Sequence, residues 1–259
     1  MAAVGDNAPR RSGRQPARLD HATSARLIPV GRETVNDRVY RELRRALIHG
    51  LFDPGQVLTI QELARRLETS TMPVREALSR LISEQALEAL PNRSVRVPPV
   101  DPARLEDLLR ARIVIEGAAL ELAAPKLTRA AFDELSTLIG RHDAQPFGET
   151  GAVEAQIEAN QAFHFSIYHA SGSTVLIPII ESLWLQSGPY IRAAALAFDP
   201  RSAISGSHYH GEIVAALKRN DVAAARTALA TDISRAFDLL RDRPAAEAKS
   251  APRRLRGGP

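Results

Sequence analysis

The spacing of apolar residues between positions 35 and 97 constrains the fold of this chain more than any other feature. Apolar side chains first recur at every fourth position, at Val35, Val39, Leu43 and Leu47. This spacing lays one apolar stripe along a helix. The stripe stops before Gly50, and FDPGQ at 52–56 has the composition of a turn. We therefore predict a helix that begins at Val35 and ends near Gly50.

Two shorter helical patterns follow this turn. Thr59 and Glu62 form a capping box that opens a short helix. After a break at 68–70, a third helix takes Ser70 or Thr71 as its cap and has Pro73 in its first turn, where the missing amide hydrogen costs nothing. The apolar faces of the two helices consist of Ile60, Leu63, Ala64 and Leu67, and of Val74, Ala77, Leu78 and Leu81.

The spacing then changes to alternation. LEAL at 87–90 and VRV at 95–97 follow period two around the turn residues 91–94, which predicts a small hairpin. Three helices closed by a hairpin form a winged helix-turn-helix, whose third helix presents its polar N-terminal face to the major groove of DNA. We assign this domain to residues 31–98.

The chain beyond Pro98 and Pro99 is helical in pattern, and no strand is expected there. Helices are predicted near 101–124, 128–143, 151–170, 174–196, 203–219 and 221–241. Amphipathic helices of this length can form a bundle with an interior cavity, which is a common ligand site. The predicted fold is mainly α, with an N-terminal winged helix-turn-helix and a C-terminal all-α bundle of about six helices at 99–243 that binds an effector.

Charge is distributed unevenly along the chain. Residues 1–32 carry six basic and two acidic side chains, and residues 244–259 carry four basic and one acidic side chain. Residues 99–243 instead carry fourteen basic and eighteen acidic side chains. Residues 1–30 and 244–259 also lack apolar periodicity, which predicts a flexible basic arm and tail. A basic arm suits contact with a polyanion, while an acidic bundle would repel one. Basic tails that serve solubility alone are the alternative.

Cysteine is absent, which excludes disulfides and thiolate metal sites. The longest strongly apolar run, VLIPII at 175–180, is too short to span a bilayer. No apolar stretch behind the N-terminal arginines can serve as a signal peptide. We expect a cytoplasmic protein with no membrane partner.

Three stretches of the chain resemble the GntR family of regulators, in the subgroup with a helical fatty-acid-regulator-type C-terminal domain, the FCD domain. The most specific is the run from ELRRALIHG at 42–50 to VRV at 95–97. NQAFHFSIYHASGS at 160–173 and HGEIVAALKRNDVAAARTALATDI at 210–233 are the others. The resemblance covers roughly residues 33–240 and implies a DNA-binding protein that responds to a small molecule.

Two positions near the third helix depart from this family. The family usually has Arg at the position of Thr71, where it contacts a guanine, and Gly at the position of Gln85. Arg75 keeps the second family arginine of the helix. We therefore expect DNA binding to be retained and the preferred operator sequence to differ.

Six residues are candidate DNA contacts. Arg75 lies on the side of the third helix away from its apolar face, where its guanidinium can reach a guanine edge in bidentate fashion. Gln61, Ser70 and Thr71 suit phosphate oxygens or base edges, and Arg65 and Arg93 are expected phosphate contacts from the second helix and the wing tip. As alternatives, Arg75 pairs with a Glu, Thr71 only caps its helix, and the other arginines are ordinary surface charges.

The resemblance also implies a metal site in the helical domain. Asn160 and His164 are four residues apart, about 40° round a helix, so both face the same way. With His210 and Asp232 they align with a family site that is usually Asp, His, His and His. The set here suits a divalent ion such as Zn, Ni or Mn, although losing one imidazole weakens it for zinc-like ions. A hydrogen-bonded polar cluster without an ion is the alternative, and His208 is a less favoured substitute ligand.

Two arginines are candidate partners of the effector. Arg112 has apolar neighbours on the first bundle helix, and a partly buried arginine needs an anion. Glu116, one turn later, can be that anion, which would make Arg112 structural. Alternatively, Arg112 or Arg192 binds a carboxylate of the effector.

These features favour a transcription regulator, not an enzyme, whose affinity for double-stranded operator DNA changes when a small carboxylate binds the bundle. One winged module offers few base contacts, so we expect a symmetric homodimer on an inverted repeat. A metal-dependent hydrolase is supported only by the clustered His and Asp residues, and the chain lacks common hydrolase motifs. An architectural DNA binder would use the basic arm, but the acidic helical domain argues against it.

Overall fold

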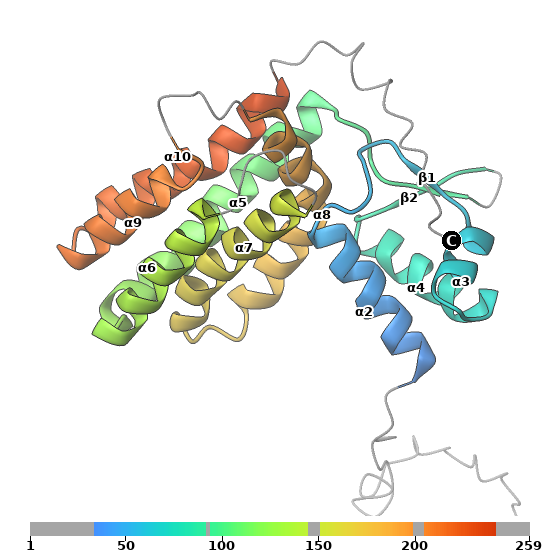
Figure 1. The fold of residues 1–259 in the computed structure, drawn as a ribbon, viewed down its shortest axis with the longest axis horizontal. Helices are drawn as coiled ribbons and strands as arrows, with labels where there is room; N and C mark the ends of the chain where they lie inside the picture. The colour runs from blue at the N-terminus through green and yellow to red at the C-terminus, as the bar shows by residue number, and fades with distance from the viewer. Residues whose placement is uncertain (1–33, 92–93, 145–150, 199–204, 242–259) are drawn as a thin grey trace, which may run out of the picture. The chain divides into compact units, whose positions relative to one another are not determined.

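A computed structural model describes residues 34–91, 94–144, 151–198 and 205–241. The described elements follow one another as α2, β1, α3, α4, β2, β3, α5, η1, α6, α7, α8, α9 and α10 (Figure 1). The predicted arm at 1–30 and tail at 244–259 lie outside these ranges. Within them, no helix combines the length and the apolar character needed to cross a bilayer.

The N-terminal helices share one core. They are α2 (Val35–Ile48), α3 (Ile60–Arg66) and α4 (Thr71–Ser83), and the hairpin of β2 (Glu88–Ala89) and β3 (Val95–Arg96) forms the wing. All three predicted helices are confirmed, and Thr59 caps α3 by accepting a hydrogen bond of 3.3 Å from the backbone N–H of Glu62.

The structure adds a strand that the sequence pattern did not indicate. This strand, β1 (Val57–Leu58), pairs antiparallel with β3, with Val57 opposite Arg96, and the sheet order is β1-β3-β2. Two residues are too few to show a period of two. Only pairing with β3 defines this strand.

Left-handed residues end two helices of the winged domain. Gly50 follows α2 with φ 64°, and its N–H donates to the carbonyl of Leu47 at 2.9 Å. Gln85 follows α4 with φ 58° and donates in the same way to Ile82 at 2.9 Å. Position 85, where the resemblance implies a glycine, therefore has a left-handed backbone, and this conformation costs glutamine more free energy than glycine.

The C-terminal part is a helical bundle, which confirms the predicted fold class. Its helices are α5 (Pro102–Ala123), α6 (Arg129–Asp143), α7 (Ala152–Ala170), α8 (Leu176–Ala197), α9 (His208–Lys218) and α10 (Val222–Arg241), with a 3-10 turn η1 (Ala124–Lys126) after α5. Helix α10 packs against α9, α5 and α8, and α7 packs against α5, α6 and α8 (Figure 1). Their shared core contains the large buried side chains Phe163, Trp184 and Phe237.

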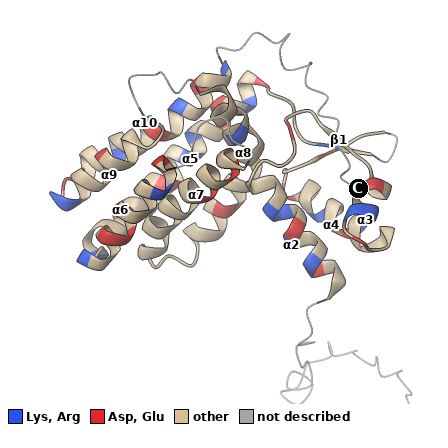
Figure 2. Ribbon diagram, viewed as in Figure 1, with Lys and Arg blue, Asp and Glu red and all other residues tan. Residues whose placement is uncertain are grey.

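Basic and acidic residues are interleaved along the helices of both parts (Figure 2). Several form exposed pairs, such as Arg110 with Glu106 at 2.8 Å and Arg226 with Glu121 at 2.8 Å. Such pairs contribute little stability. The strongly basic ends that the sequence showed belong to residues outside the described ranges.

Helix α8 contributes to both cores. Leu185 is buried in the core of the winged domain, whereas the preceding Trp184 is buried in the bundle. At Gly188 the two backbones approach so closely that an added Cβ would lie 2.2 Å from the carbonyl oxygen of Leu47 in α2. The end of α2 therefore rests on the backbone of α8.

This contact predicts that Gly188→Ala destabilises the protein. Real Cβ atoms do not approach a backbone oxygen so closely, so α2 and α8 must separate, at a cost of about 1–3 kcal/mol. Gly140→Ala in α6 is the matched control, because no atom lies within 4 Å of its added methyl and alanine favours the helix by up to about 1 kcal/mol. Urea denaturation of both variants measures the difference, and equal stabilities would contradict the tight contact.

Candidate functional site

The exposed side of α4 carries the candidate base-reading residues. Ser70 occupies the N-cap position without a side-chain capping bond, and Thr71 is the first residue of the helix. Both are exposed, as is Arg75. Among the described residues, the Arg75 side chain has no hydrogen bond or ion pair with another residue. The alternative in which Arg75 pairs with a Glu is therefore not observed.

The other candidate DNA contacts lie on α3 and at the wing. Gln61 and Arg65 are both exposed on α3. Arg65 pairs with Glu62 through an Nη2 contact of 2.8 Å. Exposed pairs of this kind contribute little, so a phosphate can replace the carboxylate at small cost. Arg93 lies outside the described residues.

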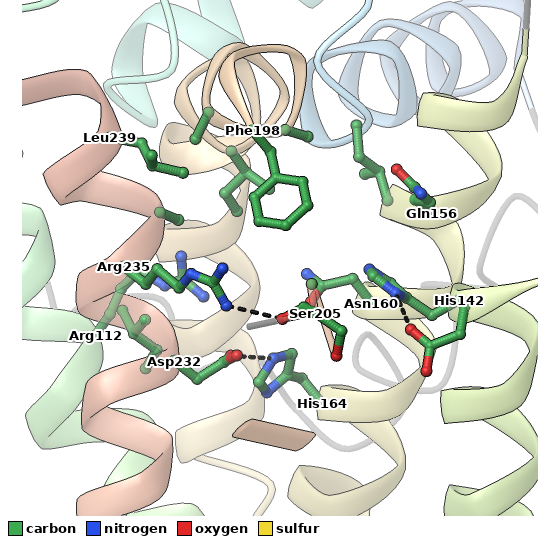
Figure 3. A pocket seen from close by; sticks show the side chains of 18 residues that line it. Arg112, His142, Gln156, Asn160, His164, Phe198, Ser205, Asp232, Arg235 and Leu239 are labelled. Atoms are coloured by element: carbon green, nitrogen blue, oxygen red, sulfur yellow. Dashed lines mark hydrogen bonds and ion pairs between the residues drawn. The ribbon is translucent and has the colours of Figure 1, made fainter. Parts of the chain in front are cut away.

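A cavity of about 340 Å³ opens in the bundle among α6, α7, α8 and α10 (Figure 3). His164 and Asp232 lie at one end of it, and Phe198 and Leu239 lie at the opposite end (Figure 3). Polar residues line the space between, including Arg235, His142, Asn160 and Ser205.

Three of the four predicted metal ligands meet at the polar end. The Nε2 atom of His164 lies 3.1 Å from Oδ2 of Asp232, and Nε2 of His210 lies 3.6 Å from the same oxygen. The ligand atoms of the three residues all lie within 4.8 Å of one another. Asn160 lines the same cavity one helical turn before His164, whereas His208 is exposed and pairs with Glu212.

A chain of buried hydrogen bonds fixes the proton on His164. The hydroxyl of Tyr168 donates to Glu116 at 2.5 Å, so its oxygen is left to accept a hydrogen bond from Nδ1 of His164 at 3.2 Å. Burial raises the pKa of Tyr168 well above its ordinary value, and the Glu116 carboxylate adds to this shift. Tyr168 therefore remains a donor, and the Nδ1 atom of His164 carries the proton.

This arrangement leaves a lone pair facing a carboxylate. Burial lowers the pKa of His164, against the opposing effect of Asp232, which favours the neutral ring. Burial alone would raise the pKa of Asp232, but His210 and His164 lower it, so the carboxylate is ionised. A neutral ring with its proton on Nδ1 presents an unprotonated Nε2 to Oδ2 of Asp232. Two acceptors at 3.1 Å repel, so the contact requires either a proton on Nε2 that is donated to Asp232 or a cation between the two atoms.

The donor set fits a divalent cation. Both ring nitrogens of His210 are buried without a hydrogen-bond partner among the described residues. Ligands of one ion, each at about 2.0–2.2 Å from it, lie roughly 3–3.5 Å apart. The separations of Asp232 from His164 and from His210, 3.1 and 3.6 Å, are close to this range. Two imidazoles and one carboxylate suit Zn, Ni or Mn. The second nitrogen of His164 is held by Tyr168, as is usual for metal-binding histidines.

Arg112 is part of the same buried chain. Its Nε donates to Glu116 at 2.6 Å and its Nη2 at 3.3 Å, and its side chain is 3% exposed. The guanidinium also lies 4.6 Å from the centre of the Trp184 ring. The predicted partner, Glu116, is confirmed, and Arg112 lines the cavity as well.

Arg192 lies elsewhere and does not line this cavity. Its Nη2 donates to Glu154 of α7 at 3.0 Å, and its Nη1 lies 3.8 Å from Asp53, in the turn after α2. It thus joins the winged domain to the bundle beside Gly50, whose Cβ position would overlap the Arg192 side chain.

Several residues of the cavity were not found by the sequence reasoning, among them two adjacent residues of α6. His142 and Asp143 lie at the end of α6, and Asp143 accepts hydrogen bonds of 2.6 and 2.7 Å from the Ser207 hydroxyl. His142 lies 5.8 Å from His210, measured between ring centres. A single histidine at a helix end has no spacing pattern, so only tertiary packing could bring it to the cavity.

A winged helix-turn-helix joined to a helical bundle with an internal cavity defines a class of DNA-binding regulators with a separate ligand domain. Residues 35–97 match the gntR family of bacterial regulatory proteins, and residues 107–235 match the FCD domain. The chain belongs to the GntR family of transcription regulators and carries an FCD domain.

Individual relatives agree with this assignment. The transcriptional regulator McbR of Escherichia coli K12 is 34% identical over 193 residues, which cover 74% of this chain and 86% of the relative. The repressor RspR of the same strain is 26% identical over 200 residues, covering 76% and 85%. The solved structure of E. coli McbR/YncC has a TM-score of 0.72 at 32% identity and covers 81% of this chain and 98% of its own. These relatives are described as regulators, which leaves the hydrolase alternative without support.

Proposed function

We propose that this regulator binds an operator through α4 and the wing, and that a small carboxylate held by a divalent cation in the bundle cavity changes its affinity for that operator. The observation that carries the proposal is the cluster of His164, His210 and Asp232, where two ring nitrogens face one carboxylate and where His164 and Asp232 line the end of the cavity.

The exposed face of α4 supports sequence-specific DNA binding. Arg75 can direct its guanidinium to a guanine, while Ser70, Thr71 and Gln61 are exposed beside it. Arg65 and Arg93 supply contacts to phosphates that raise affinity without reading sequence. Since one such face contacts few bases, two protomers related by a dyad would bind an inverted repeat.

The cavity supports binding of a carboxylate. His164, His210 and Asp232 would hold the cation, with the amide of Asn160 as a further ligand. A bound cation supplies a positive charge and open coordination positions for a carboxylate oxygen. Arg112 lines the same end and can donate to a second carboxylate oxygen from the part of its guanidinium that Glu116 does not use.

Helix α8 offers a physical route from the cavity to the DNA-binding domain. Ile191 and Ala194 of α8 line the cavity, and Gly188, one turn earlier, touches the end of α2 through its backbone. Arg192, also on α8, pairs with Glu154 of α7 and with Asp53 in the turn after α2. A ligand that displaces α8 must therefore displace α2.

A first test concerns base reading by Arg75. Arg75→Ala should weaken binding to the operator, located by footprinting as an inverted repeat, by about 1–3 kcal/mol, and should weaken binding to random DNA much less. Arg110→Ala is the matched control, because it removes an exposed helix charge from the bundle. Fluorescence anisotropy on both duplexes measures the two affinities. Equal losses on operator and random DNA would make Arg75 a phosphate contact.

A second test concerns the metal. An ion bound only by the folded state stabilises it by mass action, by about 2.7 kcal/mol at one hundred times its Kd. Adding Zn, Ni or Mn to chelator-treated protein should therefore raise Tm. Asp232→Asn should remove this response, and His208→Gln, on the exposed face of α9, should retain it. Metal analysis of untreated protein that finds no ion, together with a Tm indifferent to added metals, would leave the three residues as a polar cluster.

The third test measures control of DNA binding. Metal-loaded protein on its operator is titrated with mono-, di- and tricarboxylates, and at least one should change the operator Kd by about 5–150-fold, the usual range of coupling between sites. Asp232→Asn should bind the operator with unchanged affinity and ignore the carboxylates. If metal raises Tm but no carboxylate changes the operator Kd, the cavity does not control DNA binding.

A further inference from the structure

The cavity is divided into a polar end and an apolar end. Figure 3 shows Phe198 and Leu239 across the cavity from His164 and Asp232. Ile157, Ile191 and Ala236 also line it, from α7, α8 and α10. A ligand that fills this space must be polar at one end and apolar at the other.

Charges in the lining of the cavity are almost balanced. Among the described residues that line the cavity, Arg112 is paired with Glu116 and Asp143 accepts hydrogen bonds from Ser207. Arg235 donates to the carbonyl of Ser205 at 2.8 Å, and its guanidinium lies 5.1 Å from the centre of the Phe198 ring. With Asp143 and Arg235 cancelling, a divalent ion bound by Asp232 leaves one positive charge, which one carboxylate neutralises.

A second carboxylate at the other end would find no uncompensated cation among the described lining residues. Arg235, whose guanidinium lies 5.1 Å from the centre of the Phe198 ring, already donates to the carbonyl of Ser205 and is balanced by Asp143. Its charge would lie beside Phe198, Leu239 and the neutral amide of Gln156, and an anion held among uncharged side chains without a counter-charge is disfavoured. An alkyl or aryl group would instead remove those side chains from water. The volume of about 340 Å³ is near the lower limit of ligand pockets, roughly 300–1,000 Å³, so the group must be short.

We infer that the effector is a small monocarboxylate with an apolar tail, its carboxylate at the His164–Asp232 end and its tail against Phe198 and Leu239. This inference rests on the proposed function, because it assumes that the cavity binds a carboxylate. The inference adds the chemical class of the effector, which carries one negative charge and has an uncharged tail in place of a second acidic group.

The test compares two series of acids on the full chain loaded with Mn. Isothermal titration is run with straight-chain monocarboxylates from acetate to octanoate, and with the dicarboxylates of equal carbon number. Each added methylene should tighten binding about fourfold until the cavity is full. Hexanoate should bind at least about tenfold more tightly than adipate, which differs from it in carrying a second carboxylate at the far end.

A substitution in the apolar end sharpens this comparison. Leu239→Lys should reverse the preference, so that adipate binds more tightly than hexanoate, because the new ammonium can pair with the second carboxylate. Asp238→Asn is the matched control, since removing this carboxylate raises the net charge by the same one unit at the neighbouring position, where the side chain is 54% exposed, and should leave hexanoate preferred.

The outcomes separate the inference from the proposed function. If adipate equals or exceeds hexanoate in the unsubstituted protein, or if chain length has no effect, the inference is wrong while carboxylate binding stands. If no acid of either series binds the loaded protein, the proposed function fails and the inference fails with it. Reversal by Leu239→Lys and not by Asp238→Asn is the result expected from a tail that lies against Leu239.

Discussion

The backbone contact between α8 and α2 at Gly188 is the constraint on which the rest of the structure depends. Side chains can change rotamer when their surroundings move, but two backbones in direct contact can only move together. Since close-packed interiors transmit displacement, the helix that lines the cavity is also the support of the DNA-binding domain. Leu185, buried in the winged-domain core from its position on α8, strengthens the same link. Such a shared element can connect the two sites, because a ligand shifts an equilibrium only between states that differ in their contacts with it.

A second feature, the buried chain from Arg112 through Glu116, Tyr168 and His164 to Asp232, would be costly in a purely structural core. Apolar residues of the same volume often stabilise a core as well as a buried ion pair does, or better. The chain instead directs the protons of Arg112 and Tyr168 onto Glu116, and thereby leaves the Nε2 lone pair of His164 turned toward the cavity. The cost in stability is understandable if these hydrogen bonds serve to hold His164 in a fixed orientation as a metal ligand.

The positions at which the resemblance implies a departure from the family lie in two parts of the structure. Thr71 lies on the exposed face of the reading helix, and Asn160 and Asp232 line the cavity. The elements that hold these residues in place keep ordinary features, such as the Thr59 cap of α3 and the left-handed Gly50 after α2. Gln85 is the exception, because it occupies a left-handed position where glycine would be less strained.

The sequence alone determined the order and type of the helices, because periods of 3.6 and caps such as Thr59 are properties of local chain geometry. It also placed Asn160 and His164 on one face of α7, since both belong to one helix. Tertiary structure decided what lies opposite them. His142 of α6 lines the cavity, whereas Arg192 does not line it and pairs with Asp53 instead. The positions of side chains on different helices depend on how those helices pack. The strand β1 and the backbone contact at Gly188 have the same origin: neither exists in its own segment, and both arise only when a distant part of the chain supplies the other half of the contact.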